Sequence, residues 1–179
     1  REGRYGLKPG EVLPYDYYTD EKLNHQRDTS LDILRLINVD VKNKSYDFFY
    51  SEKHKNKAKS FFSKIDNKKI IIALNIKGSS QKRRFLDRDI KKILRELRNI
   101  SQHLIIILMH EPKDLEIISQ FIDNKTSEYV IPSYPTESIL DVAALIHNVD
   151  LVITPDTSLV HMACALEIPL VAVYSNNLE

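Results

Sequence analysis

Apolar and amphipathic segments alternate along the chain from residue 70 onward. Continuously apolar runs predict buried strands at residues 70–74, 104–109, 129–131, 151–154 and 170–174. Between them, apolar residues spaced three and four apart predict helices at residues 87–98, 113–122, 136–147 and 158–166. Strands without polar alternation are typical of a parallel sheet with helices on both faces. The pattern therefore predicts a doubly wound α/β domain, in which ligands bind beyond the carboxyl ends of the strands.

The first part of the chain shows a different pattern. Residues 1–19 have no sustained period and predict a loop or an extended arm, whereas residues 20–37 and 51–69 have helical spacing. We therefore expect an N-terminal arm with linker helices at residues 1–67 and the α/β domain at residues 68–179. The lysines of the 51–69 segment suit contact with anionic lipid at a membrane surface or with substrate phosphates, but we favour a solvated face.

The composition narrows the class of protein. Its 26 basic and 25 acidic residues give a net charge of +1, so a general nucleic-acid binder is not expected and any anion site must be local. The single cysteine forms no internal disulfide, which favours a cytoplasmic location. The longest apolar run, residues 104–109, is shorter than the roughly 18 to 20 residues of a membrane span, so we expect a soluble protein. The sequence opens at Arg1 and closes soon after a predicted strand, which indicates a piece of a longer protein.

A lone glycine marks the first candidate site. Gly78 follows the first predicted strand, and the other glycines all lie within the first ten residues. A glycine here lets the backbone turn tightly or approach a ligand closely. Hydroxyl and basic side chains surround it, and this combination suits a phosphate group; they belong to Ser79, Ser80, Lys82, Arg83 and Arg84. The spacing matches neither a P-loop nor a dinucleotide fingerprint, and an ordinary strand-to-helix turn with solvated cations is the alternative.

The second candidate site is the turn after the strand at residues 151–154. Asp156 or Thr157 fits the N-cap of the next helix, whose first N–H groups then point beyond the sheet. Such a helix start carries partial positive charge and favours an anionic oxygen. His161 lies three residues after Ser158, so both side chains share one face near that start.

Three other interpretations apply to this turn. A hydrolase built from Asp156, Ser158 and His161 is disfavoured because the residues are too close in sequence and no Gly-x-Ser-x-Gly elbow is present. A metal site at His161 and Cys164 lacks enough clustered ligands. Helix capping without any function is the serious rival.

Acidic residues also follow the second predicted strand. Glu111 and Asp114 lie on the ligand side of the sheet, where a carboxylate can bind ribose hydroxyls. Acidic residues at a helix start are also stabilised by the helix dipole alone, so a purely structural role is equally open.

Residues 141–174 resemble the C-terminal domain of glycosyltransferase family 9, the heptosyltransferases. The family typically has an Asp-Thr-Gly or Asp-Thr-Ser turn, a histidine soon after it, and a proline opening the last strand. The matching residues are Asp156, Thr157, Ser158, His161 and Pro169. The family's other mark, a Gly-x-Ser segment with a basic pair and an aromatic residue, resembles residues 78–85.

The resemblance implies a GT-B fold, of which this chain is the Rossmann-like, donor-binding C-terminal half. It implies an inverting transfer of heptose or a related sugar, usually from ADP-heptose, to a lipopolysaccharide core or related surface glycan at the cytoplasmic face of the inner membrane. No cofactor or metal is expected. By position, Gly78, Asp156, Thr157, Ser158 and His161 would bind the donor. Arg83, with Lys82 or Arg84, would stabilise the departing nucleoside diphosphate, Glu111 or Asp114 would bind the ribose, and the Tyr134 backbone would bind the base.

The chain departs from the family's pattern in two respects. Ser158 stands where glycine is commoner, and the register of the basic pair is ambiguous by one residue. The acceptor domain, with the carboxylate expected to act as general base, has no match, so we expect this chain alone to be inactive and to reach its glycolipid acceptor only through a missing N-terminal domain. A sugar-nucleotide epimerase of the same fold and a non-catalytic nucleotide-binding or interaction module are the alternatives.

Overall fold

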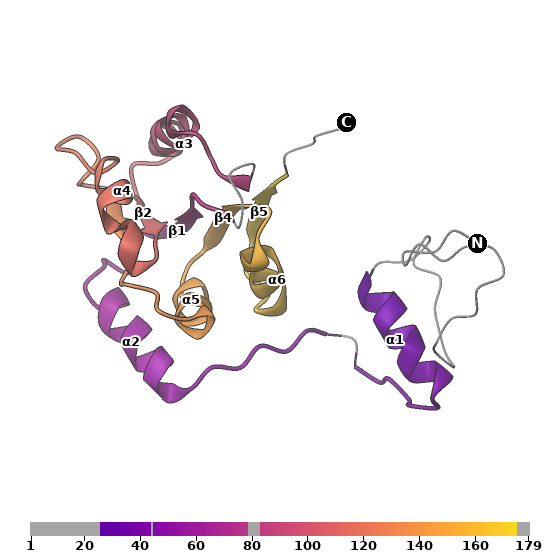
Figure 1. Cartoon of the computed structure of the whole chain (residues 1–179). Coiled ribbons are helices and arrows are strands. Elements are labelled where there is room, and N and C mark those ends of the chain that lie inside the picture. Colours follow the sequence, from indigo (N-terminus) through magenta and orange to yellow (C-terminus); the bar gives the residue numbers. More distant parts are fainter. Residues whose placement is uncertain (1–25, 44, 79–82, 175–179) are drawn as a thin grey trace, which may run out of the picture. The chain divides into compact units, whose positions relative to one another are not determined.

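The apolar runs form a five-stranded parallel sheet within the part of the chain that the structure describes (Figure 1). This computed structural model describes residues 26–43, 45–78 and 83–174. The strands are β1 (Ile70–Asn75), β2 (Leu104–Met109), β3 (Val130–Pro132), β4 (Leu151–Pro155) and β5 (Leu170–Val173). Every neighbouring pair is parallel. The predicted α/β fold is confirmed.

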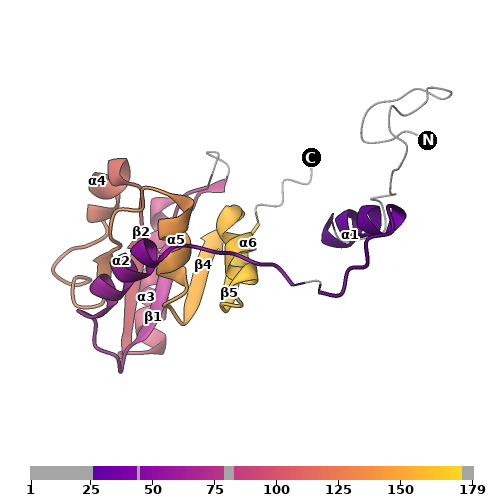
Figure 2. The same cartoon turned by 90° about the horizontal axis from the view of Figure 1, so that it is seen from below.

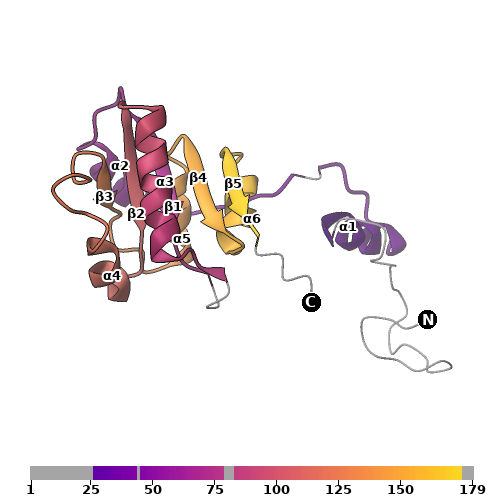
Figure 3. The ribbon, with the colours of Figure 1, turned by 90° about the horizontal axis from the view of Figure 1, so that it is seen from above.

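Helices cover both faces of the sheet, because alternate strand residues point to opposite sides. Ile72 and Leu74 face one core cluster, which includes residues of α3 (Asp87–Ile100) and α4 (Leu115–Ser119). Ala73 faces the other cluster, which includes residues of α2 (Glu52–Phe62), α5 (Ile139–Ile146) and α6 (Ser158–Ala165). Figure 2 shows α2, α5 and α6 on the near side of the sheet, and Figure 3 shows α3 on the other.

The chain separates into two compact units, residues 1–45 and residues 46–179. The first contains α1 (Gln26–Leu36). The second contains α2, which buries Ala58 completely and packs Phe61 and Phe62 against the core cluster shared with α5. Thus the helix that the sequence assigns to the linker is packed on the α/β domain. The predicted division of this chain after residue 67 stays a prediction.

Several predicted helices begin or end elsewhere in the structure, and the segment expected at residues 51–69, for example, is helical only over α2. The helix expected from residue 136 begins at Ile139, because Ser138 is its N-cap and accepts a hydrogen bond from the Asp141 N–H. The helix expected at residues 113–122 is a 3₁₀ turn, η2 (Pro112–Asp114), followed by the short α4. In α4 the Ser119 hydroxyl donates back to the Leu115 carbonyl, and the chain then turns at Asp123, whose carboxylate accepts from the N–H groups of the following residues.

The strand order determines where the sheet offers a crevice. The order is β3-β2-β1-β4-β5, so the chain proceeds from β1 to one edge and then returns to the other side of β1. The loops after β1 and β4 therefore diverge at the carboxyl end of the sheet, where α/β proteins bind ligands. No helix in the described ranges has the length and apolar character needed to cross a bilayer.

Candidate functional site

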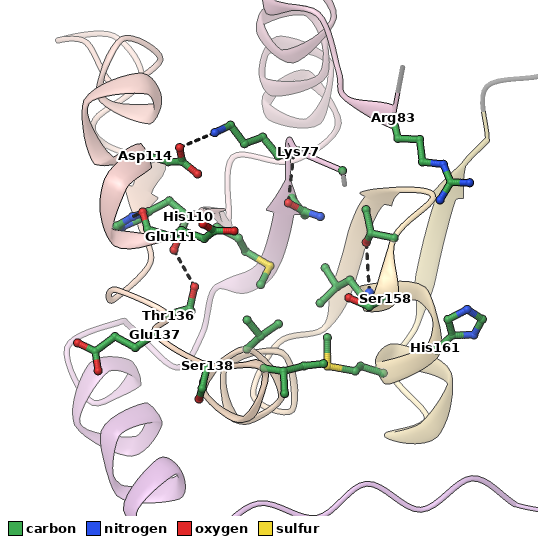
Figure 4. Close-up of a pocket in the computed structure, with 18 of the residues that line it drawn as sticks. Lys77, Arg83, His110, Glu111, Asp114, Thr136, Glu137, Ser138, Ser158 and His161 are labelled. Atoms are coloured by element: carbon green, nitrogen blue, oxygen red, sulfur yellow. Dashed lines mark hydrogen bonds and ion pairs between the residues drawn. The ribbon is translucent and has the colours of Figure 1, made fainter. Parts of the chain in front are cut away.

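A pocket of about 950 Å³ lies at the carboxyl end of the sheet (Figure 4). Its walls come from the loops after β1, β2, β3 and β4 and from the start of α6. Both candidate motifs line it, since Gly78 and Arg83 belong to one loop and Asp156, Thr157 and Ser158 to the other. The pocket thus occupies the place where the strand order reverses.

The loop after β1 requires glycine at position 78 for steric reasons. A Cβ atom on Gly78 would lie 2.1 Å from the carbonyl oxygen of Arg83 and 2.6 Å from its Cβ. The loop is closed by a hydrogen bond of 3.1 Å from the Phe85 N–H to the Ile76 carbonyl. Close approach of two backbone segments, rather than a left-handed conformation, therefore explains the lone glycine.

A partly buried polar network fixes the turn after β4. The Asn75 amide at the end of β1 donates to the Thr154 hydroxyl at 2.9 Å, and the hydroxyls of Thr154 and Thr157 are 3.1 Å apart. Thr157 has an extended backbone and accepts a hydrogen bond from the Leu159 N–H, as an N-cap residue does. The network connects β1, β4 and the start of α6, so it orients the positive end of that helix toward the pocket.

Arg83 connects the two motifs. Its guanidinium Nη2 lies 3.4 Å from Asp156 Oδ2, and both side chains are partly exposed. Asp156 therefore draws the guanidinium toward the α6 N-terminus. An anion bound there would contact both the Arg83 guanidinium and the first N–H groups of the helix. Ser158 and His161 are exposed on α6, and Figure 4 shows His161 on the side of that helix away from Lys77 and His110.

The opposite wall carries paired charges. Lys77 forms an ion pair with the buried Asp114, and Lys113 Nζ lies 2.5 Å from Glu111 Oε2. The hydrogen bond and charge of Glu111 raise the pKa of the exposed Lys113 ammonium. Two carboxylates beside lysines make this wall polar and close to neutral, which suits hydroxyl groups better than a phosphate.

His110 joins the loops after β2 and β3. Its ring is buried, with Nδ1 2.8 Å from the Glu111 carbonyl and Nε2 3.0 Å from the Ser133 carbonyl. The Thr136 hydroxyl donates to the His110 carbonyl at 2.7 Å. These contacts hold the backbone beside Glu111 and Thr136 in the pocket wall.

Some of the predicted site residues line the pocket and others do not. Those lining the pocket are Gly78, Arg83, Glu111, Asp114, Asp156, Thr157, Ser158 and His161. The lining in the described part of the chain does not include Arg84 or Tyr134; the Tyr134 ring is buried and its phenol donates to the Asp141 carbonyl at 2.8 Å. Ser79, Ser80 and Lys82 lie outside the described residues.

The sequence alone predicts no part in a ligand site for several residues of the pocket wall. These are Asn75, Lys77, Thr136, Glu137 and Ser138. Asn75 carries a signal in retrospect, since it is the polar residue that ends an apolar strand. The others follow strands that were predicted, but only the fold shows that their loops meet. Among the described residues, no group of three or more His, Cys, Asp or Glu side chains could hold a metal ion.

Comparison with known families decides the classification of the chain. A family model, glycosyltransferase family 9 (heptosyltransferase), matches residues 20–178. The chain belongs to this family. No curated protein sequence matches this chain.

Solved structures of low sequence identity support the fold of this family 9 chain. A glycosyl transferase family 9 protein from Veillonella parvula has a TM-score of 0.70 at 20% identity, with 86% of this chain and 44% of that chain covered. E. coli ADP-heptose lps heptosyltransferase II has a TM-score of 0.57 at 22% identity, covering 72% and 39%. The E. coli heptosyltransferase WaaC with ADP has a TM-score of 0.64 at 17% identity, covering 88% and 48%. The chain spans less than half the length of each of these proteins.

Proposed function

We propose that this chain is the donor-binding half of an inverting glycosyltransferase that takes heptose or a related sugar from a nucleotide-diphosphate sugar. The observation that carries the proposal is the pairing of Arg83 with Asp156 beside the α6 N-terminus, within one pocket at the switch point of the sheet. Family 9 membership supports the reaction class. ADP-heptose is the proposed donor, since a relative of similar fold has been solved with ADP.

The proposed chemistry places negative charge next to Arg83. When the bond between sugar and diphosphate breaks, charge develops on the departing nucleoside diphosphate. A guanidinium and a helix N-terminus that are already in place stabilise that charge without reorganisation. The Asp156 carboxylate orients Arg83 through their ion pair, and its oxygens can accept hydrogen bonds from sugar hydroxyls. Thr157 fixes the turn by capping α6.

The remaining groups receive roles by their place in the pocket or, for Tyr134, Lys82 and Arg84, by the resemblance to the family alone. Ser158 and His161 would contact the sugar, Glu111 or Asp114 the ribose, and the Tyr134 backbone the base. Lys82 or Arg84 would add a second cation. The acceptor, a lipopolysaccharide core or related glycolipid, and the general base would be held by a further domain at the cytoplasmic face of the inner membrane. The isolated chain would then bind donor without transferring sugar.

Calorimetric titration of the chain with ADP, UDP and ADP-heptose tests the proposal. We expect selective binding of ADP and ADP-heptose, and Arg83→Gln should weaken it by about 1 to 3 kcal/mol because a charge-assisted hydrogen bond is lost. Arg88→Gln is the matched control, since Arg88 lies on α3, has a side chain that is 82% exposed and is not among the lining residues. Absence of nucleotide binding, or equal affinity of both variants, would remove the support for this site.

A further inference from the structure

The Lys57 side chain of helix α2 contacts residues that flank a pocket-lining segment. Lys57 Nζ donates to the Pro135 carbonyl at 2.9 Å, lies 3.2 Å from Asp141 Oδ2 and sits 5.0 Å from the centre of the Tyr134 ring. These three partners belong to the segment from β3 into α5. The side chain of Lys57 is 33% exposed and that of Asp141 only 7%, so the ion pair is largely shielded from water.

The partners of Lys57 lie on both sides of the pocket-lining residues. Thr136, Glu137 and Ser138 line the pocket, and they lie between Pro135 and Asp141 in the sequence. Asp141 Oδ2 also accepts from the Glu137 N–H at 3.0 Å, and the Asp141 N–H donates to Ser138 Oγ at 3.2 Å. The Lys57 ammonium therefore connects Pro135, at the beginning of this loop, to the Asp141 carboxylate, which accepts from the Glu137 N–H.

The charge state of Asp141 agrees with this geometry. Burial by itself raises the pKa of the Asp141 carboxyl, but hydrogen bonds from Lys57 and from the Glu137 N–H outweigh it and keep the pKa below its usual value. Without the ammonium, a buried carboxylate would lose its counter-charge, and the Pro135 carbonyl would lose its donor. Both changes favour a different loop conformation.

We infer that Lys57 is a positioning residue for the pocket loop at residues 135–138. Through it, α2 holds the shape of the nucleotide-sugar pocket and is more than a connection between domains. Lys57 acts through Asp141 and the loop backbone and makes no contact with the ligand. The choice of ligand rests on the function proposed above. The effect on the loop does not.

A ligand-free measurement tests the positioning first. Lys57→Met keeps the length of the side chain and removes its charge, and Lys59→Met is the matched control because Lys59 is exposed on the same helix. We expect amide exchange at Glu137 to rise about tenfold in Lys57→Met, the size of one lost charge-assisted contact, and the Asp141 pKa to rise toward its usual value. Lys59→Met should change neither. Unchanged exchange and an unchanged Asp141 pKa would overturn the inference.

A double-mutant cycle then separates positioning from general destabilisation. If Lys57 acts through Asp141, Lys57→Met and Asp141→Asn should each reduce ADP affinity, and the double variant should lose no more than the worse single variant. Additive losses would contradict the coupling. If the unaltered chain binds no ADP, the proposed function fails, while the exchange and pKa measurements still decide the role of Lys57.

Discussion

Gly78 shows how a single residue permits the pocket to form. Its missing side chain allows the Arg83 backbone to pack directly against it, and Arg83 is the residue that reaches Asp156. The contact is to backbone atoms, which cannot move aside as the end of a flexible side chain can. The packing of Arg83 against position 78 therefore requires glycine there.

Gly78→Ala should displace Arg83 from Asp156. We expect a loss of about 1 to 3 kcal/mol in the free energy of unfolding, because the added methyl group overpacks a rigid contact. ADP affinity should fall together with stability. Urea denaturation and titration of the same sample measure both, and a variant that matches the unaltered chain in both would show that the loop tolerates a side chain there.

At the scale of elements, the start of α6 is held by side chains from two strands. Thr157 caps the helix, Thr154 contacts that cap, and Asn75 donates to Thr154. Thr154 is fully buried, so its hydroxyl is shielded from competing water. The direction of the helix dipole relative to the pocket thus depends on these three residues.

Thr157→Ala tests this arrangement. Loss of the cap should cost about 1 kcal/mol of stability and should weaken ADP binding, since the first turn of α6 lines the pocket. Thr157→Ser keeps the hydroxyl and serves as the control, with both properties close to those of the unaltered chain. Thermal unfolding and calorimetry would record the difference, and equal losses in the two variants would assign the effect to the methyl group.

The sequence predicts these elements better than their contacts. The strands and the helices at α3 and α6 follow from local apolar patterns, and the Asp156-Thr157 cap follows from local chemistry. Less predictable were the short α4 and the later start of α5, since each depends on hydrogen bonds of individual side chains. The pairings of Lys57 with Asp141 and of Lys77 with Asp114 join distant segments, and no local pattern encodes them.

At the scale of the whole chain, the position of α2 defines the unit that carries the pocket. Ala58, Phe61, Phe62 and Ile65 belong to or pack against the core cluster that includes α5. The Phe61 and Tyr134 rings pack edge to face, with their centres 5.4 Å apart. This compact unit begins at residue 46, well before the first strand.

Two truncations test this division. A chain of residues 46–179 should unfold cooperatively and bind ADP as the whole chain does. A chain of residues 68–179 should lose at least about 3 kcal/mol of stability, because the apolar side chains of α2 leave the core. Denaturant unfolding of the three chains measures the difference, and equal stability of the two truncations would mean that α2 adds little to the domain.

The strand order also affects which part of the domain folds last. One helix connects β1 to β2, whereas Asn75 and Thr154, which join β1 to β4, are 79 residues apart. Closing the longer loop is less favourable, and the intervening segments must first be in place. We therefore expect the side of the pocket formed by β4 and α6 to form late in folding. A nucleotide held there would bind only chains that have finished folding, and it would protect them by mass action.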